Sequence, residues 1–503
     1  MDRFIPRSIS CDVNWFDVDQ MSLDFGQLNL PPIVYKRVIS LNASSRLTLD
    51  SELIQRYNVN GPRYTSYPTA LQFNPFTPSQ WQQAVEHSSF INKDLSLYFH
   101  LPFCATLCYY CACSKIVTRK REPAREYLDL LKRELSLVAQ HFPDRFVSQL
   151  HWGGGTPTFL NDDQITELMA VTNDNFRFRD DQEREFSLEI DPRTVDVNRI
   201  SHLRQAGFNR LSLGIQDFDA KVQKAVNRVQ SFGQTKEVIL AARGNDFKSI
   251  SVDLIYGLPH QTVKSFTKTL EQIVSLSPDR ISIYNYAHLP DRFTPQKRIL
   301  VSDLPAPEAK LKILQLCIES LTSAGYVYIG MDHFSKPDDD LAIAQVNGTL
   351  QRNFQGYSTH ADCDLIAFGI TSISQIGNAY SQNVKTIDEY RDCLNRGELP
   401  VQKGVLIDPD DMIRKKVIKN LICHYSLDFS AISQEFSVDC LDYFESELIE
   451  LQPMIEDGLV VVSNQGISVT QKGRLFIRNI CMVFDRYIVG APDQENSRFS
   501  RAI

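Results

Sequence analysis

The chain has 503 residues, of which 43% are hydrophobic and 23% charged, a balance typical of a globular protein with two or three domains. Its net charge of −8 and its pI near 5.8 argue against general nucleic-acid binding, which favours a basic surface. No apolar run is long enough to span a membrane, the start has no signal-peptide pattern, and the cysteines are mostly spread singly, so we expect a cytoplasmic protein in a reducing compartment.

The first segments of the chain precede any regular pattern. Residues 1–46 have no clear periodicity, and we treat them as an N-terminal extension to which no role is assigned. Residues 47–94 are predicted to form a folded N-terminal arm. Within it, residues 61–69 (Gly-Pro-Arg-Tyr-Thr-Ser-Tyr-Pro-Thr) have the composition of a rigid, aromatic-rich turn.

Residues 95–375 alternate regularly between short β-rich runs and amphipathic helical stretches such as 123–141 and 262–275. The predicted strands lie at 95–101, 148–152, 186–191, 210–215, 250–255 and 280–286. The segment 217–246 holds either one helix or two. Strand–helix alternation predicts a parallel sheet, which is either an open doubly wound sheet or an incomplete barrel. In both, the loops that follow the strands carry the chemistry.

A cysteine-rich loop follows the first of these strands: Cys104-Ala-Thr-Leu-Cys108-Tyr-Tyr-Cys111-Ala-Cys113. Three thiolates spaced C-x3-C-x2-C can hold three corners of a cubane iron–sulfur cluster and leave one iron open to a small molecule. Structural zinc would need a second ligand pair, and no such pair appears downstream. Cys113 could be a fourth ligand, as in ferredoxin-like electron carriers. The spacing of the first three resembles that of the radical S-adenosylmethionine (radical SAM) enzymes.

The second strand ends in a glycine-rich turn, Gly153-Gly-Gly-Thr-Pro157. Without β-carbons the backbone can approach a ligand closely and adopt positive φ. The turn lacks the Gly-Lys-Ser/Thr ending of a phosphate-binding loop. Its place one strand–helix unit after the cysteine loop is similar to that of the element that holds the amino group of SAM. Tyr110, within the cysteine loop, can pack on an adenine ring or belong to the core.

Polar residues recur in or directly after the later strands. Glu189 ends the third strand, Gln216 ends the fourth, and Asp253 lies within the fifth. Because polar groups in buried parallel strands are costly unless they bind something, we expect these three to line a polar pocket. Arg228 could pair with the carboxylate of SAM or be a solvated helix arginine.

Beyond residue 376 the pattern becomes mainly helical, with helices expected at 415–425, 431–436 and 441–457 and a hairpin at 458–470. Helices followed by a hairpin resemble a winged helix, which either binds DNA or serves as a packing or lid module. Lys415, Lys416 and Lys419 form only a small basic patch, which favours the second interpretation.

Eight segments of the chain together resemble the oxygen-independent coproporphyrinogen III oxidases. They are residues 61–70, 104–113, 151–158, 253–259, 285–290, 330–334, 353–357 and 500–503. The resemblance runs from about residue 47 to the end. Cys113 supports this choice, because the related haem-chaperone proteins generally have a non-cysteine aromatic residue at its position.

The resemblance implies an incomplete (β/α)6 barrel over 95–375 with a mainly helical, winged-helix-like C-terminal domain over 376–503. It also implies one 4Fe–4S cluster, held by Cys104, Cys108 and Cys111, with Cys113 near the site as a catalytic residue and not a ligand. Two SAM molecules are implied. The first would contact Tyr98, Gly154, Glu189 and Ile373. The second would contact Tyr110, Gly155, Thr156, Gln216, Arg228, Asp253 and Ala287. Tyr110 departs from the family, whose best-known members have phenylalanine there.

The activity implied is the conversion of two propionate side chains of coproporphyrinogen III to vinyl groups, giving protoporphyrinogen IX in haem biosynthesis. A 5′-deoxyadenosyl radical derived from SAM would remove hydrogen from the propionate β-carbon. Arg63, Lys115 and Arg119 are candidate cations for the propionates. The family expectation is a monomer, and the sequence identifies neither the electron donor nor the acceptor. A haem-handling protein and another radical reaction on a tetrapyrrole are the alternatives.

Overall fold

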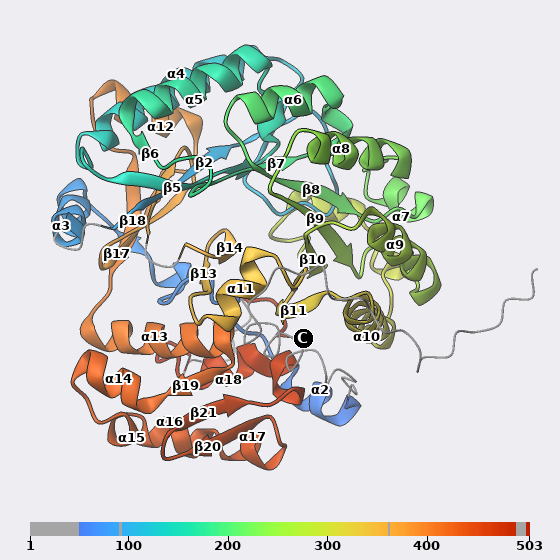
Figure 1. Cartoon of the computed structure of the whole chain (residues 1–503), viewed down its shortest axis with the longest axis vertical. Coiled ribbons are helices and arrows are strands. Elements are labelled where there is room, and N and C mark those ends of the chain that lie inside the picture. The colour runs from blue at the N-terminus through green and yellow to red at the C-terminus, as the bar shows by residue number, and fades with distance from the viewer. Residues whose placement is uncertain (1–49, 90–92, 361–362, 489–498, 503) are drawn as a thin grey trace, which may run out of the picture.

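The computed structural model describes residues 50–89, 93–360, 363–488 and 499–502 (Figure 1). The predicted extension, residues 1–46, lies outside this part of the chain. An arc of strands with helices on its outer side forms one half of the molecule, and a mainly helical region forms the other (Figure 1). In the part of the chain that is described, no helix combines the length and the apolar character needed to cross a membrane.

The six predicted strands are confirmed, and they lie side by side, parallel and in chain order. They are β2 (Leu95–Leu101), β5 (Phe146–Gly154), β7 (Glu185–Ile190), β8 (Arg210–Gln216), β9 (Ser249–Tyr256) and β10 (Arg280–Asn285). The helices between them are α4 (Glu122–Ala139), α5 (Asp162–Asn175), α6 (Val197–Gln205), α7 (Ala220–Ala225), α8 (Phe232–Gly244) and α9 (Val263–Leu276). The segment 217–246 therefore holds two helices.

These helices cover the convex face of the curved sheet, as does α10 (Pro307–Ser323) (Figure 1). The strand order has two ends, so the sheet does not close. A doubly wound sheet would carry helices on both faces. The fold is therefore the incomplete barrel, and its concave face is free to carry the site.

The sheet is wider than the six strands predicted from the sequence. A seventh parallel strand, β15 (Asp364–Phe368), pairs with β2, and antiparallel strands extend both edges. They are β16 (Ile373–Ile376), β17 (Ala379–Asn383), β18 (Val401–Leu406) and β1 (Asn74–Pro75) on one side, and β12 (His333–Ser335) and β11 (Val327–Gly330) on the other. A two-residue strand, β6 (Arg177–Phe178), also pairs with β5.

The change to a helical pattern predicted at residue 376 is therefore placed too early. The sheet continues to Leu406, with only α12 (Ile387–Asn395) inserted between β17 and β18. The reason is compositional, because β17 contains Ser381, Gln382 and Asn383 and lacks the apolar alternation from which strands are predicted.

Side chains along β2 alternate between the hydrophobic core and the concave face of the sheet. Leu95, Leu97 and Phe99 are fully buried, and Phe99 stacks on Phe368 of the neighbouring β15. The residues between them, such as Tyr98, point to the opposite face because side chains alternate along a strand. The core thus lies between the sheet and its helices, and the polar face lines the concave side.

The C-terminal region has a hydrophobic core of its own. Its helices are α13 (Pro409–His424), α14 (Phe429–Phe436), α15 (Cys440–Tyr443), α16 (Glu445–Glu450), α17 (Gln452–Glu456) and α18 (Ile477–Val483). The predicted hairpin is present as β20 (Val460–Ser463) and β21 (Gly466–Val469), and β19 (Ser426–Asp428) pairs with β21 as a third strand. The helix α11 (Asp340–Val346) and the hairpin of β13 (Gln351–Asn353) and β14 (Gly356–Ser358) lie between this region and the arc (Figure 1).

The N-terminal arm divides between the two halves. Its first helix, α2 (Ser51–Tyr57), packs on the C-terminal region, where Tyr57 meets Phe476 edge to face. Its second, α3 (Pro78–Ser89), packs on β16–β18 of the sheet. Arg478 of α18 donates to the carbonyls of Gly61, Pro62, Ser500 and Arg501, so one guanidinium ties the arm to the last residues of the chain.

A buried carboxylate, Glu134 of α4, holds the extended edge of the sheet. It accepts hydrogen bonds from the N–H of Gly369 (2.8 Å), the side-chain amide of Asn383 (2.6 Å) and the hydroxyl of Tyr390. Burial raises the pKa of Glu134 to about 7, although these hydrogen bonds act in the opposite direction. The folded protein therefore holds this proton more tightly than the unfolded chain does.

We expect this carboxylate to make the protein less stable as the pH rises from about 4.5 to about 7. In that window the folded form binds more protons at Glu134 than the unfolded form, so the free energy of unfolding falls by up to about 3 kcal/mol. Denaturant titrations of the wild type and of Glu134→Gln at a series of pH values test this. Glutamine does not titrate, so the variant should show a flatter profile. Profiles of equal slope would contradict the assignment.

Candidate iron–sulfur and SAM site

The cysteine loop begins where β2 ends, at the C-terminal edge of the parallel sheet. A short parallel pair, β3 (Phe103–Cys104) and β4 (Ile116–Val117), closes its base. The N–H of Tyr109 donates to the Val226 carbonyl (3.0 Å), and the Asn227 amide donates to the Leu107 carbonyl (2.8 Å). Lys115 Nζ binds the carbonyls of Cys111 and Cys113, at 3.1 and 3.3 Å. The loop is thus held by its own backbone and by the segment after α7.

The three predicted ligand sulfurs differ in environment. Cys108 Sγ lies 3.8 Å from Arg193 and 3.7 Å from Arg228, so two guanidinium groups can stabilise a thiolate there. A hydrogen bond with Cys113 is the largest of the effects that lower the pKa of Cys111 to about 6. Burial raises the pKa of Cys104 to about 11, against a contact from Thr156 Oγ1 at 3.6 Å.

This donor set fits an iron–sulfur cluster. Ligands of one tetrahedral zinc ion lie about 3.8 Å apart, given Zn–S bonds of about 2.3 Å. Among the described residues, the three cysteine sulfurs do not form a group within 4.8 Å of one another. They are therefore too widely spread for a single ion, as expected of thiolates that bind separate irons of one cluster.

Cys113 has a different setting from the other three. Its side chain is exposed to solvent, whereas Cys108 is buried and Cys104 and Cys111 are partly buried. The hydrogen bond with Cys111 and burial raise its pKa, and the charge of Glu189 adds to that effect. Cys113 is therefore a neutral thiol that faces the site.

The glycine turn packs directly against the cysteine loop. A β-carbon at Gly155 would lie 2.6 Å from the carbonyl carbon of Pro102, and Gly154 has φ +109°. The N–H groups of Gly155 and Thr156 donate to the carbonyls of Leu101 and Phe103, at 2.9 and 2.8 Å. The sequence predicts a close approach of the glycine turn to a ligand. In the structure, the turn makes a close approach to the backbone of residues 101–103 at the start of the cysteine loop.

The polar residues of successive strands meet on the concave face. Glu189 accepts from the N–H of Gly154 (3.2 Å) and lies 3.3 Å from His151 Nε2. The ring of Tyr98 stacks on that of His151, with centroids 5.9 Å apart. Two strands away, Asp253 accepts from Ser212 Oγ at 3.1 Å. Burial, assisted by the charge of Glu189, raises the pKa of Asp253 to about 6.

Arg228 is buried, so it is not the solvated helix arginine that was one interpretation. It follows α7 and donates to Asp191 at 3.1 Å, and Asp191 also binds Arg193 at 2.6 Å. Sequence reasoning missed Asp191 and Arg193. The available signal was the run Asp191-Pro-Arg193 directly after the third strand. Next to Arg228, Gln216 ends β8 at φ +70°, and a β-carbon at Gly214 would touch both side chains.

Three further predicted SAM contacts, Tyr110, Ala287 and Ile373, lie in different surroundings. Tyr110 packs on a buried cluster that includes Val226 and Tyr286, and Ala287 is exposed just beyond β10. Ile373, at the start of β16, packs with Tyr380 and Phe73.

The candidate substrate cations also differ in setting. Arg63 forms an ion pair with Asp332 and lies 5.9 Å from the ring of Tyr284 on β10. Lys115 is engaged with the loop carbonyls, and Arg119 is exposed.

The parallel strands and the cysteine loop define a protein of the radical SAM class. The family model described as the Radical SAM superfamily matches residues 98–273, and the one described as the HemN C-terminal domain matches residues 407–476. A 4Fe–4S cluster and SAM are the cofactors of this class.

The likeness to individual proteins spans nearly the whole chain. Oxygen-independent coproporphyrinogen III oxidases from Pseudomonas aeruginosa and Escherichia coli are both 49% identical, covering 90% of this chain and 98% of each relative. The solved structure of coproporphyrinogen III oxidase (HemN) from Escherichia coli, a radical SAM enzyme, matches with a TM-score of 0.83. It is 47% identical and covers 88% of this chain and 100% of that one. The chain belongs to the family of oxygen-independent coproporphyrinogen III oxidases.

Proposed function

We propose that the protein converts two propionate side chains of coproporphyrinogen III to vinyl groups without oxygen, giving protoporphyrinogen IX for haem synthesis. The observation that carries this function is the 49% identity to named oxidases over 98% of their length, which includes both the barrel and the C-terminal region. Cys113 also supports this function, since the resemblance implies that haem-chaperone proteins generally have a non-cysteine aromatic residue at its position.

Cys104, Cys108 and Cys111 would hold the cluster. When bound, the cluster and SAM together supply one electron and the means to remove a hydrogen atom from the substrate. The chain supplies the surroundings, since Arg193 and Arg228 place positive charge beside Cys108.

Two SAM molecules are part of the proposal. The group of Tyr98, Gly154, Glu189 and Ile373 would contact the first. The group of Tyr110, Gly155, Thr156, Gln216, Arg228, Asp253 and Ala287 would contact the second. Two polar centres support this division, one around Glu189 and His151 and one around Arg228 and Asp191.

For the substrate, Arg63 is the best-placed of the three candidate cations. Burial lowers its pKa to about 10, so the guanidinium remains protonated at neutral pH. Its position near Tyr284 on β10 puts it on the concave side of the sheet.

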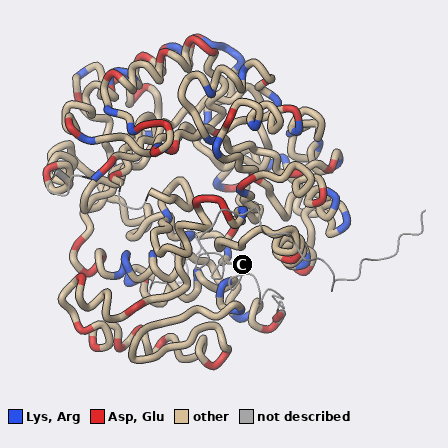
Figure 2. The backbone as a smooth tube through the Cα atoms, in the orientation of Figure 1, with Lys and Arg blue, Asp and Glu red and all other residues tan. Residues whose placement is uncertain are grey.

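The protein is proposed to act as a cytoplasmic monomer with a separate electron donor and acceptor. Lys and Arg alternate with Asp and Glu over the outer helices, which supports a function without nucleic acid (Figure 2).

The direct test is an anaerobic assay of the reconstituted protein with SAM, a reductant and coproporphyrinogen III, analysed by mass spectrometry. Protoporphyrinogen IX together with 5′-deoxyadenosine is the expected result. Cleavage of SAM without loss of carbon dioxide would keep the radical SAM class but move the function to haem handling or to another tetrapyrrole reaction.

Cys113→Ser should retain the cluster but turn over about 10²-fold more slowly, as expected when a group that transfers hydrogen is replaced. The reason is that Cys113 is a neutral thiol beside the ligands and is not needed to hold iron. Iron content and product formation, measured on the same preparation, check this. Loss of iron from the variant would mean that Cys113 is a fourth ligand.

A further inference from the structure

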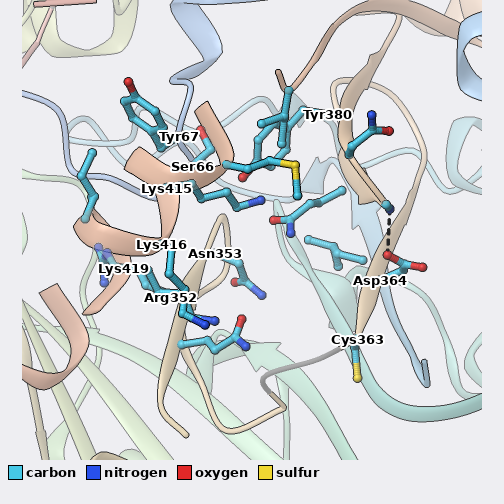
Figure 3. Close-up of a pocket in the computed structure, with 18 of the residues that line it drawn as sticks. Ser66, Tyr67, Arg352, Asn353, Cys363, Asp364, Tyr380, Lys415, Lys416 and Lys419 are labelled. Carbon is cyan, nitrogen blue, oxygen red and sulfur yellow. Dashed lines mark hydrogen bonds between the residues drawn. The ribbon is translucent and has the colours of Figure 1, made fainter. Parts of the chain in front are cut away.

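A cavity lies at the end of the barrel opposite the cysteine loop. It has a volume of about 290 Å³, and Ser96, Gln149 and Asp364, near the starts of β2, β5 and β15, line it together with α13. Figure 3 shows Asp364 opposite the lysines of α13. From Ser96 to Leu101, where β2 ends before the cysteine loop, the strand spans about 16 Å at its usual rise. The cavity is therefore distinct from the proposed cluster site.

Basic side chains dominate the charge of this cavity. Lys415, Lys416 and Lys419 come from α13 and Arg352 from β13 (Figure 3). These lysines are the small basic patch noted in the sequence, and all three line the cavity.

The acidic groups in the cavity are already matched. Glu435 pairs with Lys416 at 2.8 Å. Asp364 pairs with Arg145 at 2.8 Å and accepts from the N–H of Gly377 at 2.9 Å. Neither carboxylate is within ion-pair distance of Lys415 or Arg352.

Lys415 and Arg352 have no carboxylate within 4.0 Å among the residues that the structure describes. Lys415 is partly buried, and its Nζ lies 4.7 Å from the ring centre of Tyr380. Burial lowers the pKa of Lys415 to about 8, although the more distant charge of Asp364 acts in the opposite direction. Arg352 uses Nε for the Arg63 carbonyl (3.2 Å) and lies over Tyr357, while one terminal nitrogen is buried without a hydrogen-bond partner. Removing such cations from water is costly unless an anion accompanies them.

We propose that this cavity binds an organic carboxylate, with Lys415 and Arg352 as the cations that hold it. Tyr380, Ile407 and Ile418 provide apolar surface beside the cations, which favours an organic acid over an inorganic anion. The volume lies at the lower end of small-molecule pockets, which hold about 300–1,000 Å³. It suits a carboxylate-bearing side chain or a small dicarboxylic acid and not a whole macrocycle.

Two sources would supply this chemistry: a propionate of the tetrapyrrole, or a free dicarboxylate. Only the first rests on the proposed function. A cation such as Arg352 would bind either carboxylate equally well. Arg352 also donates a hydrogen bond to the carbonyl of Arg63, so the cavity lies next to the candidate substrate cation.

Protection of Lys415 from an amine-acylating reagent tests the proposal in the full-length, cluster-reconstituted protein under anaerobic conditions. Peptide mass spectrometry follows the rate of modification with succinate, with coproporphyrin III, which is unreactive, or without either. A bound probe should slow the modification of Lys415 about tenfold, the size of effect that a charged hydrogen bond has. Modification of Lys268, which is exposed on α9, should not change. Equilibrium titrations of Lys415→Met, Lys415→Arg and Lys268→Met with the same probes provide a second measurement.

Lys415→Met keeps the aliphatic contact with Tyr380 but should bind about tenfold more weakly. Lys268→Met should bind as the wild type does, and Lys415→Arg, which keeps the charge, should bind more tightly than Lys415→Met. Protection by succinate assigns the free acid, and protection by coproporphyrin III alone assigns the propionate. If neither probe protects Lys415, or if Lys415→Met binds both unchanged, the proposal is wrong. Absence of product in the conversion assay would refute the proposed function but would leave a succinate result standing.

Discussion

Cys104→Ser, Cys108→Ser and Cys111→Ser should each lose the cluster and with it all measurable conversion of coproporphyrinogen III. Each change removes one of three thiolates that a single loop contributes, and a serine hydroxyl is a poor substitute for a thiolate in binding iron. Cys108→Ser should be at least as severe as the others, because it also removes the sulfur that Arg193 and Arg228 contact.

Iron and sulfide content after anaerobic reconstitution, with the visible absorbance of the cluster, is the measurement. Cys393→Ser on α12 is the matched control and should reconstitute as the wild type does, since Cys393 lies outside the loop. If one of the three variants kept a full complement of iron, that cysteine would not be a ligand.

Gly155→Ala should lower the rate by about 10²-fold, the usual cost of displacing reacting groups by about 1 Å. The added methyl group would lie 2.6 Å from both the carbonyl carbon and oxygen of Pro102. Because these are backbone atoms just before Cys104, relief of the overlap must move the start of the cysteine loop relative to the glycine turn.

Steady-state rates and circular dichroism of the same preparation separate this effect from unfolding. Gly244→Ala, at the end of α8, is the control, since a β-carbon there meets no atom within 4 Å. We expect that control to match the wild type in rate. An unchanged rate in Gly155→Ala would show that the contact between turn and loop is not needed for activity.

The parts of the fold that could be predicted are those with a strong local pattern. The runs that became β2 and β9 combine apolar residues with β-branched or aromatic ones, and the cysteine spacing is short enough to act as one loop. The strands β17 and β18 could not be found this way. Their residues lack a strict alternation of apolar and polar side chains, and they are strands because β17 pairs with its neighbours β16 and β18, and β18 also pairs with β1 from the N-terminal arm.

The sequence also predicted only those site residues that lie in or directly after a predictable strand or motif. The cysteine loop, the glycine turn, Glu189 and Asp253 could be identified because each follows or lies in a strand whose place is predictable. Asp191 gained importance only from its partners, since it binds Arg193 next to it and Arg228 from 37 positions further along the chain.

The sequence by itself determined the parallel strand–helix core, the cysteine loop at its C-terminal edge and the family to which the chain belongs. The strand–helix pattern left an open sheet and an incomplete barrel as alternatives, the resemblance implied the barrel, and the tertiary structure confirms it with helices on one face of a curved sheet. Only the tertiary structure brought the lysines of α13 against the start of the strands, opposite Arg352. Periodicity and ligand spacing act over a few residues and can be read in order, whereas ion pairing and burial depend on segments that meet only when the chain is folded.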